Sequence, residues 1–185
     1  MGKVYERLDD KLRTFIGKQK MYFVASAPLS GDGHVNVSPK GYDSFHIIDD
    51  RTVAYLDLGG SGIETHAHVL ENGRVTIMFC AFEGRANILR LYGKGRAYDF
   101  AHPEYSKYLK LFPDYGKVRA VIVVDVTRIQ DSCGWGVPFF EFTGERDQLK
   151  RSESHRNWDE WVAHRYKTNA VSIDGLPGLT PPEEN

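Results

Sequence analysis

The sequence predicts a mainly β protein, an antiparallel barrel with added helices. Predicted strands outnumber predicted helices, and most strands follow one another without a crossover helix between them. The clearest strand, 119–129, is dense in β-branched residues, which favour extended backbone. Because parallel βαβ folds need a helix after nearly every strand, this order of elements favours an antiparallel barrel.

The N-terminal half begins with a predicted helix and continues as hairpins. The spacing of Leu8, Leu12 and Phe15 gives one apolar face to a helix at 4–19. The predicted elements that follow are two strands at 21–28 and 34–39 around a glycine-rich turn, two more within 44–58 around the turn at 49–51, and a second helix at 61–73.

The C-terminal half continues the β pattern and ends in a helix and a tail. Its predicted elements are strands at 74–82, 88–100 and 119–129, a helix at 102–112, a strand resuming at 133–142, an amphipathic helix at 152–168 and a surface tail at 171–185. The tail is too rich in Gly and Pro for a helix. The chain has neither an internal repeat nor a linker, so we expect a single domain over 1–185.

Composition gives no reason to expect nucleic acid or a membrane as partner. The formal net charge is −1, and no apolar run approaches the roughly 20 residues needed to span a bilayer. Cys80 and Cys133 form neither a disulfide framework nor a zinc spacing, which favours a cytoplasmic location. His66 and His68 would point about 200° apart on a helix, so we expect partly exposed histidines and no metal site.

The start of the helix at 61–73 can be interpreted in two ways. Ser61 followed by Glu64 is the spacing of a capping box, in which the two side chains satisfy free N–H groups of the first turn. The same turn could instead leave the N–H groups of Gly62 and Ile63 open to a phosphate, with the Thr65 hydroxyl nearby. The two interpretations are compatible.

Two further segments leave a structural and a functional interpretation open. In "HVNVSPKG", the residues from Ser38 to Gly41 end a strand, and Lys40 is either a solvated turn lysine or a point charge for a phosphate held by the helix start. In "SCGWGVP", Trp135 between two glycines could stack on a flat ring or plug the barrel end.

Read together, these segments resemble the pyridoxamine 5′-phosphate oxidase-related family of flavin mononucleotide (FMN) binding split barrels. The resemblance covers roughly residues 5–142 and rests on the order of "FVASAP", "GHVNVSPKG", "VAYLDLGGSGIETHAHVLENGRVTIMF", "LRLYGKGRA" and "SCGWGVP". It implies a six-stranded antiparallel split β-barrel. It also implies a homodimer with FMN in each of two clefts at the subunit interface.

The resemblance also implies a set of cofactor-binding residues. Three of them, from the strand "NVSPKG", would meet the flavin and its phosphate tail: Asn36, Ser38 and Lys40. Four would lie beside the ribityl chain and phosphate: Asp57, Ser61, Gly62 and Thr65. Ser132, Gly134 and Trp135 would approach the ring system from the partner subunit, and Arg90 is a further candidate for the phosphate.

Two departures from the family pattern point away from pyridoxamine phosphate as substrate. The oxidases proper carry an Arg-Lys pair where this chain has Glu64 and Thr65, and they end in an Arg-containing segment where this chain ends in "GLPGLTPPEEN". We therefore expect an FMN-dependent oxidoreductase acting on another small molecule. The alternatives are a non-catalytic flavin, haem or deazaflavin binding or sensor dimer, and the oxidase proper. His34 and His46 have no assigned catalytic role.

Overall fold

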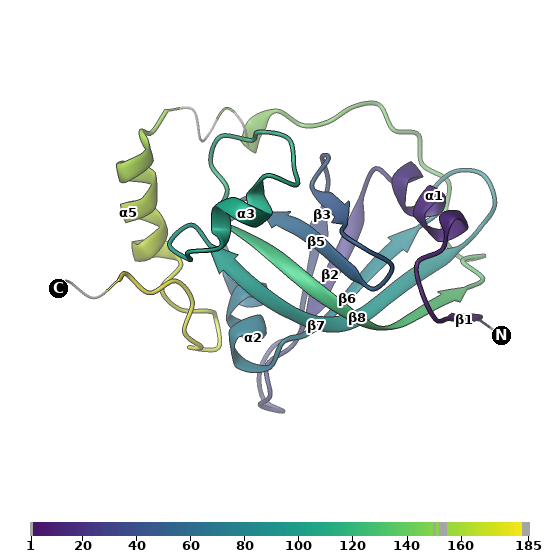
Figure 1. Ribbon diagram of the computed structural model, residues 1–185, viewed down its shortest axis with the longest axis horizontal. Coiled ribbons are helices and arrows are strands. Elements are labelled where there is room, and N and C mark those ends of the chain that lie inside the picture. Colours follow the sequence, from purple (N-terminus) through teal and green to yellow (C-terminus); the bar gives the residue numbers. More distant parts are fainter. Residues whose placement is uncertain (1, 150, 152–154, 183–185) are drawn as a thin grey trace.

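The computed structural model describes residues 2–149, 151 and 155–182, and it is mainly an antiparallel sheet (Figure 1). Along the main path the strands are ordered β3-β2-β6-β7-β8-β5-β4, and β1 pairs with β8 off this path. The strands are β1 Val4–Tyr5, β2 Tyr22–Ser26, β3 Asn36–Lys40, β4 Phe45–Ile47, β5 Thr52–Asp57, β6 Arg74–Cys80, β7 Ile88–Asp99 and β8 Ala120–Ser132.

The predicted split-barrel architecture is confirmed, although the sheet has eight strands and not six. The long central strands β7 and β8 pair over almost their full length, and β8 also pairs with β5. One face of the sheet encloses the main core, where Val24, Tyr55 and Ile122 are among the buried residues. β3 and β4 form the two free edges of this path, which leaves the barrel split.

The helices with described bounds pack around the sheet: α1 Asp10–Lys18, α2 Glu64–Asn72, α3 Tyr105–Leu109 and α5 Trp158–Thr168. α1 packs its Leu12 and Ile16 into the core, after Asp9 caps its first turn. α2 packs on β2, β6 and β7, where Val69 lies within reach of the backbone of Gly95. In Figure 1, α1 and α2 lie towards opposite ends of the sheet.

Several predicted boundaries are wrong, and each has a local cause. The helix predicted at 4–19 begins only at Asp10, because residues 4–5 pair with β8 as strand β1. The helix predicted at 102–112 is shortened to α3, and the strand predicted at 133–142 is absent from the structure. The helix predicted at 152–168 is observed as α5; residues 152–154 of that prediction lie outside the described residues.

An extended segment without regular structure, residues 133–147, follows β8; we call it the arm. In Figure 1 it leaves the N-terminal end of the molecule and crosses to the end where α5 lies. Phe140 donates its N–H to the carbonyl of Phe82 at 3.1 Å, and the Tyr42 hydroxyl donates to the carbonyl of Arg146 at 2.5 Å. The arm thus connects two distant parts of the fold.

The C-terminal tail lies on the surface only in part. Within its described residues, Val171 and Ile173 are exposed, but Ser172 and Leu179 are buried. The N–H groups of Gly178 and Leu179 donate to the carbonyls of Ala170 and Asn169, both at 2.8 Å. The tail therefore folds back beside the end of α5. Among the helices in the described parts of the chain, none is long and apolar enough to cross a bilayer.

Candidate functional site

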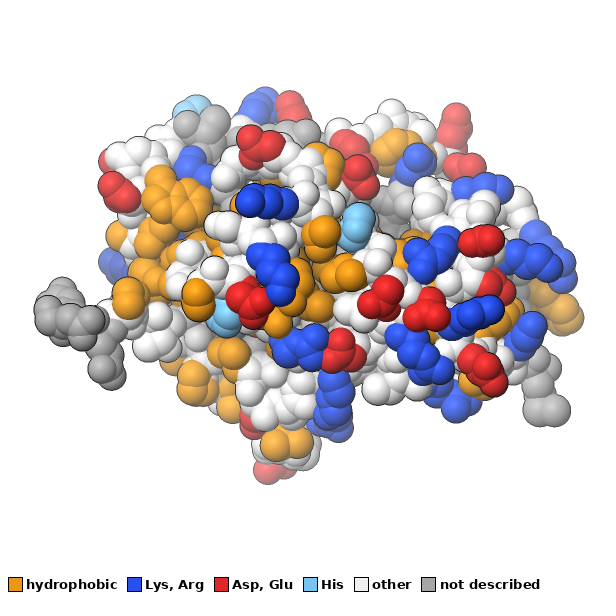
Figure 2. All heavy atoms as spheres, in the orientation of Figure 1, with side chains coloured by type: hydrophobic (Ala, Val, Ile, Leu, Met, Phe, Trp, Pro, Cys, Tyr) orange, Lys and Arg blue, Asp and Glu red, His pale blue; other side chains and the backbone are white. Residues whose placement is uncertain are grey.

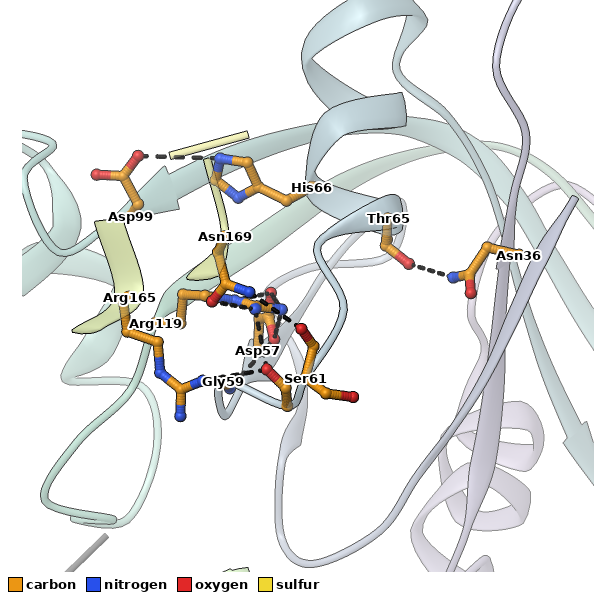
Figure 3. Close-up of polar contacts among 11 residues, drawn as sticks. Asn36, Asp57, Gly59, Ser61, Thr65, His66, Asp99, Arg119, Arg165 and Asn169 are labelled. Carbon is orange, nitrogen blue, oxygen red and sulfur yellow. Dashed lines mark hydrogen bonds and ion pairs between the residues drawn. The ribbon is translucent and has the colours of Figure 1, made fainter. Parts of the chain in front are cut away.

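The start of β3 meets the start of α2, whereas the hypothesis that Lys40 serves a phosphate at the helix start requires the other end of the strand. The Asn36 side-chain amide donates a hydrogen bond to the Thr65 hydroxyl at 2.8 Å, joining residues that are 29 positions apart (Figure 3). A pocket of about 510 Å³ opens beside them, lined by Asn36, by Ser61 and Gly62, and by Val171 and Ile173 of the tail, among others. Four of the predicted cofactor-binding residues thus converge: Asn36, Ser61, Gly62 and Thr65.

The loop that leads into α2, residues 58–63, is held from behind by buried polar side chains. Arg119 donates to both carboxylate oxygens of Asp57 at 2.9–3.0 Å, and it also reaches the carbonyl of Gly60 at 3.3 Å. Arg165 donates to the same carbonyl at 3.1 Å, and the Asn169 amide donates to the carbonyl of Ser61 at 3.2 Å. Figure 3 shows these side chains gathered on one side of the loop.

In this arrangement Asp57 holds the loop, whereas the family resemblance implied that it lies beside the ribityl chain and phosphate of the cofactor. Its carboxylate is buried against Arg119, and it also accepts from the N–H of Gly59 at 3.3 Å. Burial opposes its ionisation, but the positive charge of Arg119, helped by Lys40, outweighs this and lowers the pKa of Asp57 to about 2. Asp57 therefore stays ionised and holds the loop.

The capping box predicted at Ser61 and Glu64 is wrong. α2 begins at Glu64 with Ile63 as its N-cap residue, and no side chain caps it. The cause is that Ile63 is buried next to Gly178 and the Ser61 carbonyl is bound by Asn169, so the loop cannot place Ser61 over the first turn. The Glu64 carboxylate instead folds back beside Gly62, where a side-chain carbon would collide with it.

Lys40 lies at the opposite end of β3 from this pocket. Asn36, Ser38 and Lys40 share one face of the strand, but Lys40 lies four positions after Asn36, about 13 Å along the strand at roughly 3.3 Å per residue. The sequence suggested that the strand ends before Lys40; it continues through Pro39, which an edge strand tolerates. Lys40 lines a second pocket of about 1010 Å³ between α1 and the arm.

The remaining predicted residues lie on the other face of the sheet or beyond its end. Arg90 alternates with the core residues Leu89 and Leu91, so it faces away from the core, and it donates to the Ser132 hydroxyl at 3.0 Å. Gly134 has a φ of 65° and packs so tightly on Asn87 that any side chain would collide. Trp135 is 86% exposed. These residues are separate from the Asn36 pocket in the chain described here.

His66 and His68 are buried, which contradicts the prediction that they are partly exposed. His68 hydrogen-bonds the Ser26 hydroxyl through Nδ1 at 3.0 Å, whereas the His66 ring lies 3.9 Å from the Asp99 carboxylate. Burial lowers the pKa of both histidines, against the pull of nearby carboxylates. Both histidines are buried because α2 is covered on one side by β2 and on the other by the end of β7. Periodicity within one helix does not reveal this packing.

Sequence reasoning missed the side chains that hold the loop, namely Arg119, Arg165 and Asn169. Arg119 gave one signal: it stands at the start of the most apolar strand of the chain, where a charged residue needs a buried partner. Arg165 and Asn169 gave a weaker one, because they lie four residues apart and therefore share one side of the last helix.

Comparison with known proteins agrees with this architecture. The sequence pattern of the family described as pyridoxamine 5′-phosphate oxidase matches residues 8–133. A pyridoxamine 5′-phosphate oxidase family protein of Aspergillus flavus, ustO, is 40% identical over 192 residues, covering 95% of this chain and 77% of the relative.

Solved structures share the fold at low sequence identity. HupZ of Group A Streptococcus superposes with a TM-score of 0.52 and 20% identity, over 72% of this chain and 98% of its own. A Clostridium acetobutylicum protein of the pyridoxinephosphate oxidase family, related to general stress protein 26 of B. subtilis, superposes with a TM-score of 0.51 and 11% identity. The superposition covers 75% of this chain and 94% of that protein. The sequence match and the shared split barrel show that this chain belongs to the pyridoxamine 5′-phosphate oxidase family.

Proposed function

We propose that this protein binds FMN with its phosphate at the start of α2 and acts as an oxidoreductase on a small molecule other than pyridoxamine phosphate. The observation that carries the proposal is the Asn36–Thr65 hydrogen bond, which brings the family's two cofactor segments together at one pocket. When bound, FMN would supply hydride or electron transfer, which no protein side chain can supply by itself.

The donors at this pocket suit a phosphate. Among the described residues, no group accepts a hydrogen bond from the backbone N–H of Ser61 or Gly62. The Thr65 hydroxyl accepts from Asn36 and therefore keeps its own proton for donation, and the Ser61 hydroxyl adds another donor. The N-terminal end of α2 favours negative charge at the same place.

The charges around this pocket distinguish it from a site built on cations. Neither Lys nor Arg is among the described residues that line the pocket, and Glu64 is. Phosphate binding would therefore depend on N–H and hydroxyl donors, with Lys40 closer to the other end of the same strand face. This agrees with the absence of the Arg-Lys pair and supports a substrate other than pyridoxamine phosphate.

We propose further that the active form is a homodimer with FMN at the interface. The arm exposes large aromatic side chains, and β3 with its preceding turn exposes two valines: the exposed residues are Trp135 (86%), Phe139 (79%), Phe140 (59%), Phe142 (44%), Val35 (70%) and Val37 (58%). Exposed apolar side chains in such number favour burial against a partner. A second copy could bring Trp135, Ser132 and Arg90 to a flavin that one subunit binds by its Asn36 pocket.

The first experiment is a titration of the purified protein with FMN, followed by absorbance and flavin fluorescence. We expect saturable binding, bleaching of the bound flavin by a reduced nicotinamide donor and recovery in air. A flavin that binds and never turns over would indicate a sensor, and preferential binding of haem or a deazaflavin would indicate a different ligand. Sustained conversion of pyridoxamine phosphate to pyridoxal phosphate would contradict the proposed substrate class.

The site itself is tested by Ser61→Ala combined with Thr65→Val. Hydrogen bonds to a charged group contribute about 1.5–3 kcal/mol each, so the double variant should lose at least roughly tenfold in FMN affinity. Thr127→Ala, an exposed position on β8, is the matched control. Unchanged FMN affinity in the double variant would mean that the phosphate lies elsewhere.

A further inference from the structure

The C-terminal helix α5 lies outside the region that matches the family, yet it contacts the loop in front of α2. The match ends at residue 133, whereas α5 spans Trp158–Thr168 with Asn169 directly after it. Arg165 and Asn169 are both buried, with Asn169 completely so. Buried polar side chains this far from the barrel core need partners, and they find them in the 58–63 loop.

The Asn169 side chain has one possible orientation. Its oxygen accepts from the Arg119 guanidinium at 2.9 Å, and its nitrogen donates to the Ser61 carbonyl at 3.2 Å. Because a guanidinium only donates and a carbonyl only accepts, a flipped amide would lose both hydrogen bonds. Asn169 therefore links the buried Asp57–Arg119 pair to the backbone of the loop.

α5 is itself fixed against the barrel. Trp161 is fully buried and packs edge-on against Phe100, with ring centroids 5.6 Å apart. The Arg165 guanidinium lies 5.2 Å from the Trp161 ring and 3.3 Å from the position where a side chain on Gly59 would begin. A capping box of Asn157 and Glu160 starts the helix. Arg165 and Asn169 therefore reach the loop from a helix that is itself packed against the barrel.

These contacts determine which way the loop's peptide groups face. In a trans peptide the C=O and the following N–H point in opposite directions. Since the carbonyls of Gly60 and Ser61 are held towards Arg119, Arg165 and Asn169, the N–H groups of Ser61 and Gly62 turn away from them. Ser61 and Gly62 line the pocket at the start of α2, and in Figure 3 Asn36 and Thr65 lie across the loop from the three side chains that hold the carbonyls.

We propose that Asn169 and Arg165 are positioning residues for the phosphate end of the FMN site. They hold the carbonyls of Ser61 and Gly60 inward, and so keep the N–H groups of Gly62 and Ser61 directed at the pocket. The proposal rests on the proposed function and extends it, because it makes the segment after the family barrel a part of the cofactor site.

The test compares Asn169→Asp and Arg165→Met with the exposed control Lys167→Ala. Aspartate keeps the acceptor for Arg119 but removes the donor to Ser61, and methionine keeps the apolar stem of Arg165 while removing its donors. Two measurements are made: the dissociation constants of FMN and of riboflavin, which lacks the phosphate, and amide hydrogen exchange of the 58–63 loop in the flavin-free protein.

We expect Asn169→Asp to weaken FMN binding at least tenfold and riboflavin binding less than twofold, with faster exchange confined to the loop. Arg165→Met should act in the same direction through Gly60, which covers the case in which Asn169→Asp does not fold. Equal weakening of both flavins, or unchanged loop exchange, would overturn the proposal. If the wild-type protein bound neither flavin, the proposed function would fail, whereas loop exchange would still decide whether α5 positions the loop.

Discussion

Arg119 donates hydrogen bonds to both carboxylate oxygens of Asp57, and each side chain of the pair is only 5% exposed. The pair connects the end of β5 with the start of β8, and through Asn169 it reaches the C-terminal segment. An ion pair at this depth is costly to break, because the remaining partner keeps its charge without solvent.

Asp57→Asn should therefore destabilise the protein by about 3–5 kcal/mol in the free energy of unfolding, measured by chemical denaturation at pH 7. The control is Asp125→Asn, which breaks the Arg96–Asp125 pair; there the two side chains are 50% and 48% exposed. Exposed pairs contribute about 0–1 kcal/mol, so the control should change stability by less than 1 kcal/mol. Similar losses in the two variants would contradict the structural role of Asp57.

Asp57 should also make the free energy of unfolding depend on pH in the acid range. Its pKa is about 2 in the folded protein, below the ordinary aspartate value of 3.8, so the unfolded chain binds a proton first as the pH falls. Its contribution is complete above about pH 4 and is lost as the pH falls towards 2, with a total of roughly 2 kcal/mol. Denaturation curves between pH 2 and 5 should show this loss for the wild type, and a smaller loss for Asp57→Asn.

His66 should give stability a second dependence on pH, in a higher range. Burial lowers its pKa against the opposing effects of Asp57 and Asp99, while Arg119 lowers it further. The folded protein therefore holds the neutral ring, the unfolded chain takes up a proton below about pH 6.5, and stability falls as the pH drops through that value. His66→Gln should flatten the slope of unfolding free energy between pH 5 and 8. The exposed His155→Gln should leave it unchanged.

Glu64→Gln should change stability and FMN affinity in opposite directions. A carboxylate in the first turn stabilises a helix by about 0.3–1 kcal/mol, so its loss should lower the unfolding free energy by that amount. The same carboxylate lies beside Gly62 and lines the pocket, so its loss should tighten FMN binding several-fold by removing a like charge. Glu6→Gln serves as the control. Weaker FMN binding in Glu64→Gln would argue against a phosphate at this pocket.

The exposed aromatic residues of the arm should control the oligomeric state. If they are buried against a second copy, Trp135→Ala with Phe139→Ala should raise the dimer dissociation constant at least tenfold, measured by sedimentation equilibrium. Leu70→Ala is the control: Leu70 is 54% exposed and belongs to α2, a helix that lies on the opposite side of the molecule from the arm in Figure 1. A wild-type protein that is monomeric at all concentrations would contradict the proposed homodimer.

Figure 2 shows that one face of the protein carries lysines, arginines and acidic side chains interspersed, with hydrophobic side chains gathered near the end where α5 lies. On α5, the ring of Trp158 stacks on the ring of the buried Trp161, with ring centroids 5.4 Å apart. Trp158 is 43% exposed, so a side chain that the sequence placed on an amphipathic helix also contributes to the surface.

The sequence predicted the parts of the fold that depend on local pattern. The β-branched run of β8 and the alternation around Val35 and Val37 identified strands, and their order identified the barrel. The family resemblance brought Asn36 and Thr65 to one site, and the hydrogen bond between them agrees with it. These features are encoded within single elements or in their order along the chain.

What could not be predicted depends on contacts between distant segments. Lys40 was expected beside the phosphate from its charge and the family resemblance, yet it lies four positions after Asn36, at the other end of β3. Ser61 was expected to cap α2, but Asn169, 108 residues later, binds its carbonyl instead. No periodicity or spacing within the sequence reports a partner at that separation.

The arm has a consequence for what happens if the backbone is cut there. It is the covalent connection between the barrel and α5, and it keeps the helix near its docking surface at a high effective concentration. After a single cleavage, say within residues 135–139, the same contacts would have to form between two separate polypeptides, and dilution would drive the fragments apart. Proteolysis of the arm would therefore remove the support that α5 and the tail give to the 58–63 loop.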